Sequence, residues 1–172
     1  LWAHNDSGND SDIFLIDQNL SVTQRYVLAG VENRDWEDIV VGPGPDSARN
    51  YLYVAEIGDN EAVFPYKYIY RFEEPAIKKA HQQETITITE FETIIFELPD
   101  GRKDTEALLV DPKTRNLIVV SKREEPVNVY QIEYPYPIND TITAKQVATL
   151  PLTQIVAGSF SSDGNEILMK NY

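Results

Sequence analysis

The sequence contains no cysteine among its 172 residues, which excludes a disulfide framework and a thiolate metal site. No apolar run approaches the roughly 20 residues of a membrane-spanning helix, and no secretory signal peptide is recognisable. Basic residues are scarce, because 15 lysines and arginines stand against 28 aspartates and glutamates, for a net charge of −13. Such a chain should be repelled by nucleic acid and by anionic membranes, and it should attract cations.

Several sequence motifs of catalysis and ligand binding are also absent. There is no Gly-x-Ser-x-Gly motif for a nucleophilic serine and no Walker-type phosphate loop. The EF-hand pattern of alternating oxygen ligands with a distal glutamate is missing too. The Pro-Gly turn at residues 41–46 is not followed by a helical pattern, so it is not a dinucleotide-binding fingerprint. No reaction is therefore assigned by a motif.

Alternation of apolar and polar residues with a period of two dominates the chain, and helical periodicity is weak. Turn-forming residues separate the alternating segments, and residues 75–83 are expected to form a surface loop. The predicted strands are Ile13–Ile16, Ser21–Leu28, Asp38–Val41, Tyr51–Ile57, Lys67–Phe72, Thr85–Leu98 (with an interruption), Ala107–Val110, Leu117–Ser121, Val127–Ile132, Ala144–Leu150, Gly158–Ser161 and Glu166–Lys170.

The order of these segments repeats along the chain. WEDIVVGP, NYLYVAEIGDN and YKYIYRFEEP are followed by a second series, TEALLVDP, NLIVVSKRE and VNVYQIEYP. Repeated four-stranded antiparallel units are typical of the blades of a β-propeller. The predicted fold is therefore all-β, with one blade ending in residues 1–30, two further blades in 31–99 and 100–152, and a fourth beginning in 153–172. A β-sandwich remains the alternative, although it does not require internal repeats.

Two complete blades cannot close a ring, because propellers typically have about 4–8 blades. The chain also begins at Leu1 instead of methionine, and both of its ends fall within predicted strands. We therefore expect a partial propeller, a piece of a longer protein. The missing remainder would complete the ring, and its N-terminal part would be the place for a targeting signal.

Acidic residues stand where the first strand of each complete unit begins. In an antiparallel meander this point and the end of the second strand share one edge. If the first strand is innermost, five acids lie nearest the propeller axis and are candidate metal ligands, and the ends of second strands form a binding shell around them. The candidate ligands are Asp35, Glu37, Asp38, Asp104 and Glu106, and the shell consists of His4, Asn5, Asp6, Asp59, Asn60, Lys122 and Arg123.

Carboxylates at close quarters raise one another's pKa values and destabilise the folded chain unless something compensates. A bound cation, pairing with nearby arginine and lysine side chains, or exposure to water would each suffice. Oxygen ligands from Asp, Glu and Asn favour Ca²⁺ over Mg²⁺, so Ca²⁺ is the expected cofactor. The alternative is that these acids are ordinary turn and strand-edge charges that face solvent, or Asx turns that satisfy nearby backbone donors.

Taken in order, the segments HNDSGN, NRDWEDIVVGPGPD, YLYVAEIGDN, DTEALLVDP, SKRE and FSSDGNEI resemble a group of exported bacterial β-propeller proteins. The acid followed by EAL is similar to the strand openings of esterase-like phytase and gluconolactonase-type propellers. This resemblance implies that Glu37 and Glu106 face the axial site beside Asp35 and Asp104, often with a divalent metal. It also implies an extracytoplasmic location: periplasmic, cell-surface or secreted. The last repeat departs from the pattern, with Ser159 where an acid is expected.

Two functions are consistent with these residues. The first is an extracytoplasmic binding module that holds Ca²⁺ and presents its axial face to a small molecule or a protein. The alternative is a metal-dependent hydrolase of phosphoesters or sugar lactones, in which Glu37, Glu106 or His4 would move protons. An enzyme would need an open coordination position and a base close to a metal-bound water, whereas a binding module would not.

Overall fold

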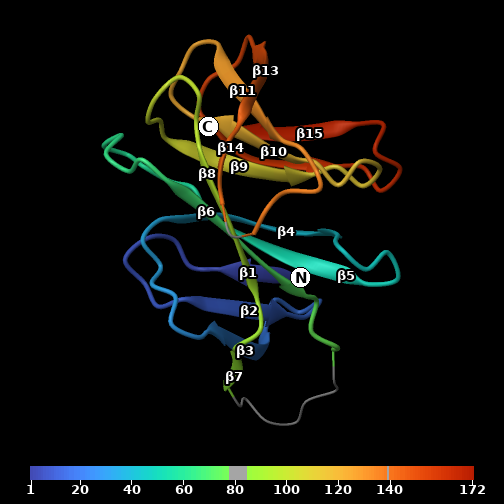
Figure 1. The fold of residues 1–172 in the computed structure, drawn as a ribbon. Coiled ribbons are helices and arrows are strands. Elements are labelled where there is room, and N and C mark those ends of the chain that lie inside the picture. Colours follow the sequence, from blue (N-terminus) through green and yellow to red (C-terminus); the bar gives the residue numbers. More distant parts are fainter. Residues whose placement is uncertain (78–84, 139) are drawn as a thin grey trace.

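The computed structural model describes residues 1–77, 85–138 and 140–172, and every regular element among them is a strand (Figure 1). Within those ranges no helix is long and apolar enough to cross a membrane. The strands are β1 (Trp2–His4), β2 (Asp12–Ile16), β3 (Val22–Leu28), β4 (Trp36–Pro43), β5 (Asn50–Glu56), β6 (Lys67–Glu73), β7 (Thr85–Ile88), β8 (Glu92–Glu97), β9 (Thr105–Val110), β10 (Leu117–Ser121), β11 (Val127–Ile132), β12 (Thr141–Thr143), β13 (Lys145–Leu150), β14 (Ile155–Phe160) and β15 (Ile167–Asn171).

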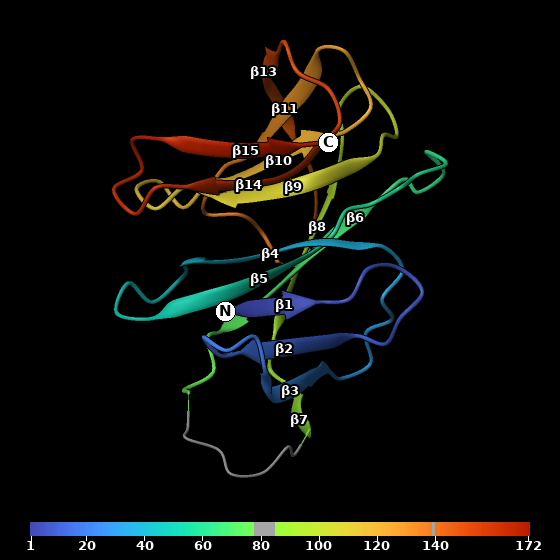
Figure 2. The same ribbon diagram turned by 180° about the vertical axis from the view of Figure 1, so that it is seen from behind.

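The strands form four sheets that follow one another in chain order (Figures 1 and 2). Their strand orders are β1-β2-β3-β7, β4-β5-β6-β8-β12, β9-β10-β11-β13 and β14-β15. The strands that open successive sheets contact one another, β1 with β4, β4 with β9 and β9 with β14. A β-sandwich would instead show two sheets face to face. The chain is thus all-β and folds as part of a β-propeller, and the predicted fold class is confirmed.

The hydrophobic core is divided into three layers, one between each pair of neighbouring sheets. Strand β5 shows how a single strand serves two layers, since Leu52 and Val54 face the first sheet while Tyr53 and Ala55 face the third. All four are fully buried. Because a central blade is covered on both faces, its strands are apolar at consecutive positions, and each buried Leu or Val contributes about 1.5–3 kcal/mol of transfer free energy.

The strand pairing departs from the predicted strands at two places. Residues 85–98 were expected to form one interrupted strand, but Thr85–Ile88 (β7) pairs in parallel with β3 of the first sheet, and only β8 completes the second. Thr141–Thr143 (β12) likewise leaves the third sheet and pairs in parallel with β8. Alternation identifies a strand but not its partner, so the sequence pattern could not reveal this exchange. Of the predicted loop at 75–83, residues 78–83 lie outside the described part of the chain.

Candidate functional site

A one-residue β-bulge interrupts the opening strand of three successive sheets. In β4, Trp36 pairs with Glu56 and Asp38 with Ala55, so Glu37 is left without a partner. The same skip occurs at Glu106 in β9 and at Val156 in β14. A bulge twists the strand and turns the side chain of the extra residue away from the regular alternation. Two of the acids predicted to open the blades, Glu37 and Glu106, therefore occupy structurally equivalent bulges.

Backbone hydrogen bonds establish the same equivalence independently. The carbonyl oxygens of Asp35, Asp104 and Gln154 accept hydrogen bonds from the amides of Gly58, Lys122 and Tyr172, at 3.2, 3.0 and 3.2 Å. Asp35, Asp104 and Gln154 thus precede the three bulges by the same two positions. In the last sheet the residue equivalent to Glu37 and Glu106 is therefore Val156 and not Ser159. The ring of acids is asymmetric, because two sheets contribute a carboxylate at the bulge and the next contributes an apolar side chain.

Two groups of carboxylates converge at this edge. Asp6, Asp35 and Glu37 form one group, and Glu37, Asp104 and Glu106 form the other. In each group the carboxylate oxygens lie within 4.8 Å of one another. Glu37 belongs to both, so it joins the turn after β1 to the second and third sheets. An oxygen-lined site of this kind suits a hard cation such as Ca²⁺.

Gly58 lies directly against the carboxylates of the first group. A Cβ atom at this position would overlap Glu37 Oε1 and the carboxylate of Asp35. The amide of Gly58 also donates to the carbonyl oxygen of Asp35. Glycine is therefore required here by close approach of the backbone to the carboxylates, and not by its backbone angles.

The carboxylates strongly perturb one another. Burial, reinforced by Glu106, Asp35, Asp6 and Asp104, raises the pKa of Glu37 from 4.5 to about 9. Burial also raises the pKa of Asp35, against a hydrogen bond from Ser7 that lowers it. No hydrogen bond or ion pair reaches the Glu37 carboxylate from the described residues. A cation placed among these oxygens would favour the ionised form and relieve the repulsion.

Lys122 and Arg123, which follow β10, offset the negative charge of Glu106 and Asp104 in the second group. Lys122 Nζ donates to Glu106 Oε1, and both side chains are largely buried. Arg123 Nε donates to Asp104 Oδ2 at 2.9 Å, and its Nη2 reaches Asn60 Oδ1. Burial raises the pKa of Glu106, while Lys122 lowers it. Among the described residues, Asp6, Asp35 and Glu37 make no such ion pair, although Lys67 attracts Asp35 and Lys122 attracts Glu37 at longer range.

The turn after β1 is fastened to the site by Asn33, a residue that sequence reasoning missed. Asn33 is buried, and its Nδ2 donates to the carbonyl oxygens of Asn5 and Asp6, at 3.1 Å each. Its Oδ1 accepts from the amide of Trp36 at 3.0 Å. Asn33 therefore fixes Asp6 relative to the strand that carries Glu37. An asparagine three residues before a tryptophan in a charged segment was the available signal.

His4 is held by backbone groups. Its Nδ1 lies 2.9 Å from the carbonyl oxygen of Asn5, and its ring also hydrogen-bonds to the backbone of Glu37. Burial lowers its pKa. Because both contacts are to the backbone, the ring connects the turn after β1 to the bulge. The geometry favours a positioning role over that of a base.

Two of the predicted site residues point elsewhere. Asp38 accepts from the amides of Ile39 and Leu108, at 2.8 and 2.9 Å, and it belongs to neither carboxylate group. Burial raises its pKa to about 7. Asp59 is buried and accepts from the amides of Val63 and Phe64, at 2.7 and 2.9 Å. Both carboxylates stabilise the backbone, Asp38 by tying β4 to β9 and Asp59 by closing a turn.

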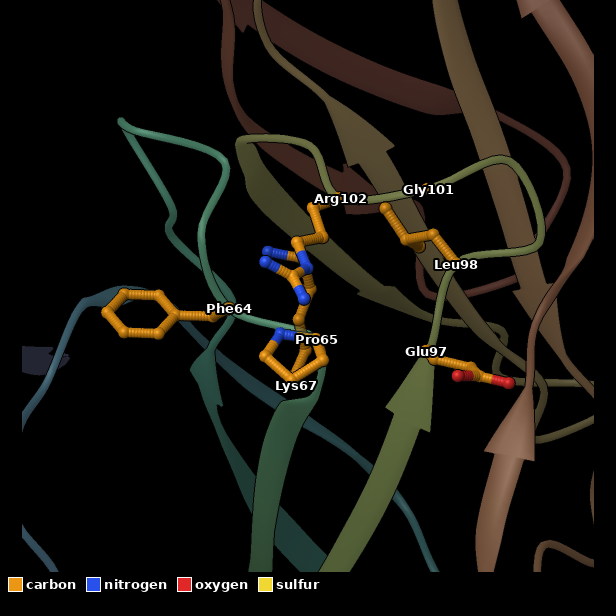
Figure 3. Close-up of a pocket in the computed structure, with 7 residues that line it drawn as sticks. All are labelled: Phe64, Pro65, Lys67, Glu97, Leu98, Gly101 and Arg102. Atoms are coloured by element: carbon orange, nitrogen blue, oxygen red, sulfur yellow. The ribbon is translucent and has the colours of Figure 1, made fainter.

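Beside the acids, a pocket of about 180 Å³ lies between the loops that precede β6 and β9 (Figure 3). Its walls include Phe64, Pro65 and Arg102, and the Arg102 side chain extends towards Pro65 and Lys67. Lys67 is almost fully buried and donates from Nζ to the carbonyl oxygen of Ile57. Burial lowers its pKa to about 8, against the attraction of Asp59 and Asp104. This lysine supplies a positive charge behind the acids.

No family model matches the chain, and no curated protein matches it. Among the solved structures similar to this chain is one described as the structure of the Dos1 propeller, at a TM-score of 0.38 and 9% sequence identity. The match covers 92% of this chain and 47% of that one, so the chain spans about half the length of the propeller it matches. A likeness at this TM-score carries no argument about this chain, and the assignment as part of a β-propeller rests on the chain's own sheets.

Proposed function

We propose that this propeller module binds a divalent cation, preferentially Ca²⁺, at the carboxylates where its second and third sheets meet. The observation that carries the proposal is the position of Glu37 at a bulge, where its carboxylate belongs to two groups of oxygens within 4.8 Å. Glu37 has no cationic partner among the described residues, whereas Glu106 and Asp104 have Lys122 and Arg123. The ligands would be Glu37 with Asp6 and Asp35, and Asp104 and Glu106 on the other side.

The chemistry of the donors favours Ca²⁺. All the proposed ligand atoms are carboxylate oxygens supplied by three segments, and Ca²⁺ tolerates irregular sets of six to eight such ligands better than Mg²⁺ does. We include an extracytoplasmic location in the proposal, on the resemblance to exported propellers. There Ca²⁺ sites typically bind with dissociation constants on the order of 10⁻⁴–10⁻³ M. The bound cation would present a positive point on the axial face to an anionic group of a small-molecule or protein ligand.

The proposal is confined to binding. A hydrolase would need a base free to accept a proton from a metal-bound water. The candidate His4 is hydrogen-bonded to the backbones of Asn5 and Glu37, and Glu106 is paired with Lys122. These contacts support a site that holds a cation and give no particular support to proton transfer.

Calorimetric titration of the chain with Ca²⁺ tests the proposal, beside the variants Glu37→Gln and Glu106→Gln. We expect binding by the wild type and at least about a tenfold loss of affinity in Glu37→Gln, since one charged ligand and its charge are removed. The control is Glu61→Gln, an exposed carboxylate on the adjoining loop, which should bind as the wild type does. Absence of heat and of thermal stabilisation with millimolar Ca²⁺ would contradict the proposal.

A further inference from the structure

Two strands, β7 and β12, pair in parallel with the outer strand of the preceding sheet. Strand β7 belongs to the connection between the third and fourth strands of the second sheet, and it covers the outer edge of the first sheet. Strand β12 belongs to the corresponding connection of the third sheet, and it covers the outer edge of the second. The second and third sheets thus each contribute one strand to the sheet before it, which Figure 2 shows for β7 beside β3.

Strands β7 and β12 share both sequence and register. Residues 85–87 and residues 141–143 both read Thr-Ile-Thr. In each case the isoleucine lies beside an aromatic residue of the covered strand, Ile86 beside Tyr26 and Ile142 beside Phe96. The pairing continues past the strands, because the amide of Ala29 donates to the carbonyl oxygen of Ile88, and that of Ala144 to Glu97. A three-residue pattern repeated in sequence, orientation and register indicates a specific mode of edge recognition.

The third sheet has the same edge without a cover. Strand β13 is its outermost strand, and no strand pairs with its far side among the described residues. Five of its six residues are exposed, including Val147 at 49%. By contrast, β3 and β8 alternate between buried and less buried positions. An uncovered edge presents a row of free backbone donors and acceptors to any extended segment that can reach it.

The position equivalent to the aromatic residue can be identified. In the second sheet the third strand begins with Lys67, which pairs with Phe96. In the third sheet the third strand begins with Val127, which pairs with Leu150. Leu150 therefore corresponds to Phe96, and Thr149 to Ile95. Because the carbonyl group of Glu97 faces β12, the backbone groups of Ile95, two residues before it, face the same way. The amide of Thr149 accordingly points outwards and that of Ala148 towards β11.

We propose that the edge of β13 is a docking site for an extended polypeptide segment of the Thr-Ile-Thr type, which adds as a parallel strand. The incoming isoleucine lies beside Leu150, and the backbone of the segment bonds to the outward groups of Thr149. Affinity comes from main-chain hydrogen bonds, and specificity comes from the alternation of β-branched side chains, as in other cases of strand addition. Charge plays little part, since Lys145 is the single charged residue of the strand.

Amide exchange measured by NMR tests the proposal on the whole chain, with a synthetic Thr-Ile-Thr-Ile-Thr peptide as the probe. At ten times the dissociation constant, protection of the Thr149 amide should rise about tenfold, because binding multiplies protection by one plus the ratio of concentration to that constant. Contacts between the peptide isoleucine and Leu150 should appear as nuclear Overhauser effects. The control peptide has proline in place of both isoleucines, and it should give neither effect.

Two adjacent proline variants sharpen the test. Thr149→Pro removes an outward amide, so the chain should keep its melting temperature and lose the peptide. Ala148→Pro removes an amide that faces β11 and should lower the melting temperature instead. An unchanged Thr149 amide with saturating peptide would overturn the proposal, as would equal binding by Thr149→Pro. So would concentration-dependent self-association that protects Thr149 without peptide, because a second copy would then be the occupant.

Discussion

The carboxylates of Glu37 and Glu106 approach each other within 4.8 Å from equivalent bulges in two neighbouring sheets. A bulge leaves one residue outside the ladder, and in both strands that residue is a glutamate. Their environments differ, however, because Lys122 is paired with Glu106, while no cation is paired with Glu37. Glu106 therefore has an ion-pair partner and Glu37 has none, and the expected effects of pH and of Lys122→Met depend on that difference.

Without a cation, the stability of the chain should fall as Glu37 ionises. The pKa of Glu37 is raised in the folded state, so its stabilising contribution is complete below the unfolded value of 4.5 and is lost as the pH approaches about 9. In the presence of a chelator, the free energy of urea unfolding of Glu37→Gln should therefore increase relative to that of the wild type as the pH rises through that window. Glu61→Gln should follow the wild type throughout. A constant difference between wild type and Glu37→Gln would contradict the assignment.

The affinity for Ca²⁺ should rise with pH over the same window. Protons compete with the cation for the Glu37 carboxylate, whose pKa is raised to about 9. Calorimetric titrations at several pH values, in buffers of different ionisation enthalpy, would count the protons released on binding. Glu37→Gln should release fewer protons than the wild type. Proton release that is identical in both would show that Glu37 is not a ligand.

Gly58→Ala should disturb the site directly. The added methyl group overlaps the carboxylates of Asp35 and Glu37, so the variant should lose about 1–3 kcal/mol of unfolding free energy, as overpacked positions do. It should also bind Ca²⁺ more weakly. In the double variant with Glu37→Ala one obstacle is gone, and a double-mutant cycle from urea unfolding should show positive coupling. Additive losses would mean that the glycine is not needed for the carboxylates.

Lys122→Met should make the chain depend more on Ca²⁺. Removing the lysine leaves the buried carboxylate of Glu106 unpaired, which typically costs about 3 kcal/mol. A cation among the carboxylates replaces the lost charge, so Ca²⁺ should raise the melting temperature of this variant more than that of the wild type. Differential scanning fluorimetry with and without Ca²⁺ measures both. Equal shifts would place any bound cation away from Glu106.

Asn33→Ala should weaken the site without touching a ligand. The change deletes two bonds to the turn that carries Asp6 and one bond from Trp36, and it should cost about 2 kcal/mol of unfolding free energy. Asn33→Asp keeps the acceptor for Trp36 but turns a carboxylate oxygen towards the carbonyl oxygens of Asn5 and Asp6, so it should lose at least as much stability and also bind Ca²⁺ poorly. If Ca²⁺ affinity in both variants matched the wild type, Asp6 would not belong to the site.

The all-β class and the repeated units were readable in advance because alternation with a period of two is a local property of strands. The edge at which the acids lie followed from meander geometry, since the start of one strand and the end of the next meet there. Asp35, Glu37, Asp104 and Glu106 could thus be placed together from the sequence. The equivalence of Val156 could not, because it depends on bulges that only the pairing of strands defines.

The sequence by itself determined which segments are strands, where they turn and on which edge the charges fall, since these depend on neighbouring residues along the chain. Only the tertiary structure decided that Asp38 bonds to Leu108 while Glu37 joins Glu106, that Gly58 lies beneath the carboxylates, and that Thr85–Ile88 crosses to another sheet. The physical reason is that strand partners, bulges and close backbone approach are relations between distant segments. They are set by packing and hydrogen bonding in three dimensions, and local pattern carries no record of them.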